Sequence, residues 1–177
     1  MQGREDSASF IQSFTGSNRL VLDYLIEEVL NQQSKDIQSF LLQTSILNRM
    51  NGSLCNAVTR NSNSQSMLET LERANLFIVP LDGERHLYRY HHLFGDLLHR
   101  RLLHHQPEII PNLHERASDW FETNNLIDEA VDHALVNRDI RRAAQLIQNH
   151  AEELFQHGGL LALIDWIHNL PDEISVC

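Results

Sequence analysis

The sequence predicts a mainly α-helical protein that contains a single β-hairpin near its middle. Apolar residues recur at steps of three and four over most of the 177 residues, which is the spacing of one helix face. The exception is segment 76–90, LFIVPLDGERHLYRY, in which two short aliphatic and aromatic runs flank Asp82-Gly83. One hairpin set between helices outlines a winged-helix unit, and regular antiparallel helical hairpins follow it.

Composition narrows the classes of function. The chain is 42% hydrophobic and 21% charged, with 7 Gly and 4 Pro, so we expect it to fold around a core. It has no run of about 18 apolar residues, and its N-terminus is polar where a signal peptide is basic and then apolar. We therefore expect a soluble cytoplasmic protein with no membrane contact. Cys55 and Cys177 offer neither a disulfide framework nor a metal-ligand spacing.

Four helices are expected ahead of the hairpin. The first spans about 18–31 and carries one apolar stripe. Ser34 is in place to cap the second helix, and the third opens at Gly52. The fourth helix begins after a polar turn, and Ser64 or Ser66 is in place to cap it. The predicted order is four helices followed by two strands.

The hairpin is expected to reverse tightly. Asp82-Gly83 is typical of a two-residue turn with positive φ, and Pro80 cannot donate to a ladder, which places its strand at an edge. In winged helices that read DNA, the helix before the wing enters the major groove, as recognition helices do. Here that helix, over 66–73, holds two Glu and one Arg, so repulsion from phosphates disfavours groove reading.

The charge balance also disfavours autonomous binding to nucleic acid. The net charge is −10, with 14 Lys and Arg against 24 Asp and Glu. Between residues 89 and 101, however, Arg89, Arg100 and Arg101 outnumber Asp96, and nearby histidines add partial positive charge. This basic patch is a candidate surface for an anion. A stand-alone winged-helix DNA-binding protein is the alternative function, and it predicts affinity that falls steeply with salt.

From Pro107 onward the pattern is that of antiparallel helix pairs. Pro107 or Pro111 begins one helix, Asn124-Asn125 ends it, and Asp139 is in place to cap a third helix after a second. A fourth helix is expected after Gly158-Gly159.

Segment 125–135, NLIDEAVDHAL, is similar to one helix of a tetratricopeptide (TPR) unit, although no clear 34-residue period repeats. Because a solenoid needs about three repeats, we expect the sequence to be a piece of a longer polypeptide.

Four segments together resemble a known family. They look like the region that follows the ATPase core in LuxR-type, ATP-dependent transcriptional regulators of the MalT-like kind, a branch of the STAND signalling ATPases. The resemblance covers about residues 10–171. The segments are VLDYL (21–25), FLLQTSIL (40–47), ANLF (74–77) and YRYHHLF (88–94).

The resemblance implies three parts. Residues 1–33 would end a helical domain that follows the ATPase core, residues 34–105 would form a winged-helix-like domain, and residues 106–177 would begin a TPR-like region. In such regulators an upstream P-loop domain binds ADP or ATP, helical repeats sense a small-molecule or protein inducer, and a C-terminal helix-turn-helix binds DNA. The chain has no Gly-x-x-x-x-Gly-Lys-Ser/Thr loop, so we expect it to bind no cofactor and catalyse nothing by itself. The implied function is a regulatory and interaction module that couples nucleotide and inducer state to domain rearrangement.

His91 is the candidate site residue that the resemblance supplies. Tyr90-His91-His92 resembles the Met-His-Asp motif of related ATPases, whose histidine contacts the β-phosphate of ADP. A histidine just after a strand and at a helix N-terminus suits this role, because backbone N–H groups and the helix dipole favour an anion there. His92 replaces the acid of the motif, so a salt bridge made by that acid is not carried over. The alternative is a packed or surface histidine without nucleotide contact.

A metal site is the third hypothesis. His92, Asp96 and His99 fall at i, i+4 and i+7 on one helical face, a spacing that could offer three ligands to zinc. One helix alone rarely closes such a site, so we expect no metal. A histidine-rich metalloenzyme would instead purify with stoichiometric metal.

Overall fold

The structure is a computed structural model that describes residues 30–156, with side chains placed for residues 30–150. The first expected helix, over 18–31, falls almost entirely outside the described residues, as does the helix expected after Gly158. Within the described range the chain forms two compact units. The first contains residues 30–55 and 62–107, and the second contains residues 56–61 and 108–156.

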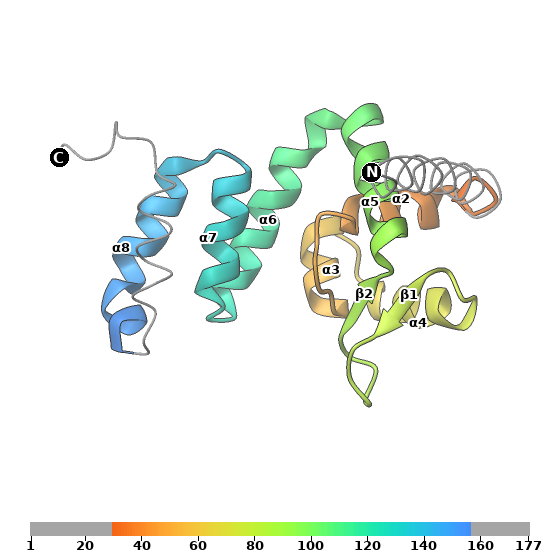
Figure 1. The fold of residues 1–177 in the computed structure, drawn as a ribbon, viewed down its shortest axis with the longest axis horizontal. Helices are drawn as coiled ribbons and strands as arrows, with labels where there is room; N and C mark the ends of the chain where they lie inside the picture. Colours follow the sequence, from red (N-terminus) through yellow and green to blue (C-terminus); the bar gives the residue numbers. More distant parts are fainter. Residues whose placement is uncertain (1–29, 157–177) are drawn as a thin grey trace, which may run out of the picture. The chain divides into compact units, whose positions relative to one another are not determined.

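The first unit is helical apart from one hairpin, which confirms the predicted fold class (Figure 1). Its helices pack around buried aliphatic and aromatic side chains, each worth about 1.5–3 kcal/mol when fully buried. Among the largest fully buried side chains are those of Leu41, Met50, Leu68, Tyr88, Phe94 and Leu98. Its elements are α2 (Lys35–Thr44), α3 (Gly52–Thr59), α4 (Ser64–Arg73), β1 (Ile78–Pro80), β2 (Tyr88–Tyr90) and α5 (His92–His105).

Local capping sets where these helices begin. Ser34 caps α2, as predicted, because its Oγ accepts a hydrogen bond from Ile37 N at 3.3 Å. Asn51 caps α3 by accepting from a backbone N–H with its Oδ1. The prediction for α4 was wrong: its N-cap is Asn63, and Ser64 is the first helical residue and is buried. A run of several cap-forming residues leaves the starting point of a helix undetermined by sequence alone.

The hairpin is held on both sides of β2. β1 and β2 are antiparallel, with Val79 facing Arg89, and Met50 exchanges backbone hydrogen bonds of 2.8 and 2.9 Å with Tyr88 on the other side. Tyr88 and Tyr90 point into the core while Arg89 is exposed, which is the alternation of a half-buried strand. Pro80 ends the edge strand β1, as its missing N–H predicts.

The predicted tight turn at Asp82-Gly83 was wrong. The two strands are joined by residues 81–87, and the residue with positive φ in this loop is Arg85, at 57°. The Asp82 carboxylate closes the loop instead, because its two oxygens accept from the N–H groups of His86 and Leu87 at 2.9 and 3.1 Å. A short acidic side chain that bonds the backbone a few residues on is a usual alternative to a glycine turn.

The second unit is built from consecutive helices. A 3-10 turn, η2 (Pro107–Ile109), leads into α6 (Ile110–Thr123), α7 (Ile127–Val136) and α8 (Ile140–Gln156). α7 packs against both α6 and α8, and the three lie side by side in chain order (Figure 1). Asp139 caps α8 through a 2.9 Å bond from Arg142 N, as predicted. The likeness of these helices to a TPR unit stays a prediction.

The two reversals between these helices use the same hydrogen-bond pattern. After α6, Leu126 N bonds to Phe121 O and Asn125 N to Glu122 O, which is a Schellman motif. The residue at the turn is left-handed in each reversal: Asn125 has φ 59° and Arg138, after α7, has φ 57°. Asparagine tolerates this conformation, whereas arginine pays a steric cost for it. Among the described residues, no helix is long and apolar enough to cross a membrane.

Candidate functional site

His91 lies at the junction of the hairpin and α5. Its N–H donates to Phe77 O at 2.7 Å and its carbonyl accepts from Gly95 N at 2.9 Å, so the backbone is fixed on both sides. The residue is the N-cap of α5, but its exposed side chain makes no capping hydrogen bond. The imidazole lies beside that of His92, with 4.5 Å between ring centroids. The structure therefore presents the His91 ring to the surrounding solvent from a rigid backbone.

Phe77, the residue that receives the His91 hydrogen bond, has an unusual backbone conformation. Its φ is 53°, which is a genuine outlier for a bulky residue and costs on the order of 1–3 kcal/mol. The Phe77 ring packs 5.4 Å from that of buried Phe94, and this contact helps to hold the strained backbone. Strain of this kind persists only where the surrounding structure over-determines it. The strained residue, Phe77, is joined directly to His91 by the backbone hydrogen bond described above.

The basic patch predicted over residues 89–101 is divided in the structure. Arg101 is half-buried and donates to Asn31 Oδ1 at 3.0 Å. Arg100 lies eight residues into α5, about 12 Å along its axis at 1.5 Å per residue. Arg49 and Arg89 flank the isolated antiparallel bridge between Met50 and Tyr88, Arg49 just before Met50 and Arg89 just after Tyr88, which puts these two chain positions near each other. Arg49 and Arg89 are far apart in sequence, so the spacing of residues along the chain could not have predicted that they lie near the same bridge.

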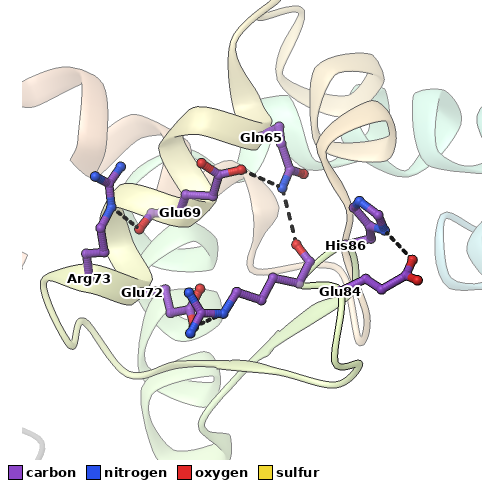
Figure 2. Close-up of a pocket in the computed structure, with 7 residues that line it drawn as sticks. Gln65, Glu69, Glu72, Arg73, Glu84 and His86 are labelled. Atoms are coloured by element: carbon purple, nitrogen blue, oxygen red, sulfur yellow. Dashed lines mark hydrogen bonds and ion pairs between the residues drawn. The ribbon is translucent and has the colours of Figure 1, made fainter.

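An acidic cleft of about 420 Å³ lies between α4 and the hairpin loop. Figure 2 shows residues that line it, among which Gln65 of α4 donates to Glu69 at 3.1 Å and to the carbonyl of Arg85 at 3.3 Å. The Arg85 guanidinium in turn lies 3.4 Å from Glu72. The helix before the wing is therefore bonded to the loop and presents carboxylates. This arrangement opposes entry of α4 into a DNA groove, as its composition predicted.

The second unit contains a feature that the sequence reasoning missed. His114 of α6 is buried, and its Nδ1 lies 2.8 Å from Nδ1 of His133 on α7. The His133 ring also stacks on Phe121, with 5.3 Å between centroids. Burial, and then the nearby His114, lower the pKa of His133 from 6.5 to about 4. The only sign of this pair in the sequence is that each histidine is adjacent to apolar positions of its predicted helix.

Metal ligation finds no support in the part of the chain that the structure describes. No three or more His, Cys, Asp or Glu side chains are grouped there to hold a metal ion. His92 and Asp96 are exposed, and His99 is partly exposed, on α5. Cys55 is buried, and burial raises the pKa of its thiol to about 12, so it is not poised as a nucleophile.

The first unit is a winged-helix domain, with helices α2 to α4 before the two-stranded wing and α5 after it. Comparison with known proteins specifies the type. Residues 26–110 match the family MalT winged helix domain.

Relatives with two different names match nearly the whole chain. It is 31% identical over 176 residues, 99% of its length, to serine/threonine-protein kinase PknK of Mycobacterium tuberculosis. It is 35% identical over 151 residues, 85% of its length, to HTH-type transcriptional regulator MalT of Cronobacter sakazakii, and 33% identical over 175 residues, 97% of its length, to MalT of Klebsiella pneumoniae. The chain covers 16%, 17% and 19% of these relatives, respectively.

Proposed function

We propose that the chain is a regulatory and interaction module of a larger signal-transduction ATPase of the MalT-like kind, located in the cytoplasm. It would couple nucleotide and inducer state to domain rearrangement and catalyse nothing by itself. Its partners would be an upstream P-loop ATPase domain, downstream helical repeats and a small-molecule or protein inducer. DNA would be bound only through a separate C-terminal helix-turn-helix.

The relatives support a regulatory role that does not depend on whether the whole protein acts as a kinase or as a transcriptional regulator. One is named a protein kinase and the others transcriptional regulators, yet each has a segment similar to nearly the whole of this chain. A segment shared by such different proteins is better explained by control than by DNA reading or phosphoryl transfer. The carboxylates of α4 argue against direct DNA binding in the same way.

The observation that carries the proposal is the presentation of His91. Its backbone is held by hydrogen bonds to the hairpin and to α5, while its imidazole is exposed and makes no cap bond. A side chain in this position is ready to meet a ligand without reorganising the domain. We therefore assign His91 as a contact to the β-phosphate of ADP held by the upstream domain of the intact protein.

The mechanism is a latch. ADP bound between the upstream domain and His91 would keep the polypeptide closed, and exchange for ATP together with inducer would release it. A ligand shifts such an equilibrium only by its differential affinity for the two states. One charge-assisted hydrogen bond is worth about 1.5–3 kcal/mol, which is about a tenfold to hundredfold bias.

The test replaces His91 in the full-length protein. His91→Ala should raise the dissociation constant for ADP about tenfold or more and increase basal activity. His105→Ala is the matched control, because His105 is also an exposed histidine and lies at the opposite end of α5. Equal ADP affinity and equal basal activity in the two variants would overturn the proposal.

A further inference from the structure

We propose that Arg49 and Arg89 form a phosphate-binding pair on the outer face of the wing, which together with His91 takes the diphosphate group of a nucleotide. This inference rests on the proposed function for the identity of the ligand. It adds two residues to the site, one of which comes from a different part of the sequence.

The hairpin register places the three residues on one face. Tyr88 and Tyr90 are buried, so Arg89 between them projects outward, opposite exposed Val79. His91 follows Arg89 by two residues along the extended backbone, so the two side chains lie on the same face. The His91 N–H donates to the carbonyl of Phe77, which continues the hydrogen-bond ladder of the hairpin.

Arg49 joins this face from the far side of β2. Met50 pairs with Tyr88 in an isolated antiparallel bridge. Arg49, one residue before Met50, and Arg89, one residue after Tyr88, flank this bridge on the same side. Both arginines are exposed. The pair spans the bridge between the α2–α3 connection and the wing.

Two like charges that lie close together on one face are destabilising. Neither guanidinium makes a hydrogen bond or an ion pair within residues 30–150, so no carboxylate in that range relieves the repulsion. The nearby acids of the hairpin loop are already engaged: Asp82 accepts two backbone hydrogen bonds and Glu84 lies 3.4 Å from His86. An anion supplied from outside this face would remove the cost.

The number of cations points to a diphosphate. A terminal phosphate carries about 1.5–2 negative charges near neutral pH, more than one histidine can balance. Guanidinium groups bind phosphate oxygens in a bidentate manner and remain charged at all physiological pH values. Two arginines beside one histidine therefore suit two linked phosphates better than the histidine alone would.

The test compares Arg49→Ala, Arg89→Ala and Arg89→Lys in the full-length protein, with Arg100→Ala as control. Arg100 is exposed on α5, about 12 Å along the helix axis from its first residue. Each alanine variant on the wing should raise the ADP dissociation constant about tenfold, as expected for loss of one charge-assisted contact, and Arg89→Lys should recover part of it. Arg100→Ala should leave ADP affinity unchanged. If the wing variants match Arg100→Ala, the inference is overturned.

Comparison with His91→Ala separates this inference from the proposed function. Weaker ADP binding in the arginine variants but not in His91→Ala supports the arginine pair and removes the histidine contact. Weaker binding in His91→Ala alone does the reverse. As a second readout, titration of the 177-residue chain with inorganic pyrophosphate should shift the backbone NMR signals of Arg49 and Arg89. Shifts confined to other regions would count against the pair.

Discussion

Acidification should destabilise the second unit through the buried histidine pair. The Nδ1 atoms of His114 and His133 are 2.8 Å apart, so one must donate and the other accept. This bond cannot form when both rings are protonated. Because the pKa of His133 is lowered to about 4 in the folded protein, the unfolded chain binds a proton more readily there. Stability is therefore complete above the unfolded pKa of 6.5 and is lost as the pH falls toward 4.

The size of the effect follows from the two pKa values. Linkage between a folded pKa of about 4 and an unfolded pKa of 6.5 removes about 2 kcal/mol of unfolding free energy between pH 7 and pH 5. A change of this size is a large part of the stability of a small domain. It would appear as a clear shift in the midpoint of urea unfolding.

The assay should report on the second unit alone. Trp120 of α6 adjoins Phe121, on which His133 stacks, and in a Trp166→Phe background its fluorescence follows this region. Urea unfolding at pH 7, 6 and 5 gives the free energy for the chain with and without His133→Gln. The parent should lose about 2 kcal/mol more than the variant by pH 5. Equal losses would refute the assignment of the pH dependence to His133.

Three further predictions concern stability. Gly52→Ala should cost about 1–3 kcal/mol because its Cβ would lie 2.7 Å from a side-chain carbon of α4, whereas Gly83→Ala, with nothing within 4 Å, should be nearly neutral in thermal melts. Tyr90→Phe should cost about 1 kcal/mol in urea unfolding by deleting the buried 2.7 Å bond to a threonine hydroxyl; an unchanged midpoint would contradict this. Arg138→Gly should stabilise by about 0.5–1 kcal/mol by relieving its left-handed backbone, while Arg141→Gly, inside α8, should destabilise by about 1 kcal/mol; the same sign for both would exclude backbone strain as the cause.

Sequence patterns predicted the elements of the fold better than their local details. Apolar periodicity and the cap at Ser34 correctly located the helices of the described region, because both depend on neighbours within a few residues. The turn at Asp82-Gly83 was mistaken, because the Asp82 carboxylate offered a competing set of backbone hydrogen bonds. The start of α4 was mistaken for a similar reason, since several adjacent residues can serve as caps.

Only the part of the candidate site that lies in one contiguous segment of sequence could be predicted. His91 was identified from a contiguous segment, and the structure gives it a fixed backbone and an exposed ring. The sequence alone could not relate Arg49 to Arg89, because the two flank the Met50–Tyr88 bridge, which joins residues far apart in sequence. The pairing of His114 with His133 likewise depends on how α6 and α7 pack. Long-range contacts of this kind are decided by tertiary structure.

The ends of the hairpin ladder bear on how the isolated chain will behave at high concentration. Exposed strand edges act as templates for pairing between molecules, and this leads to aggregation. Here one flank of β2 is occupied by Met50, and the outer strand is three residues long and closes with Pro80, which has no N–H to offer. The wing is thus poorly suited to pair with a strand of another molecule.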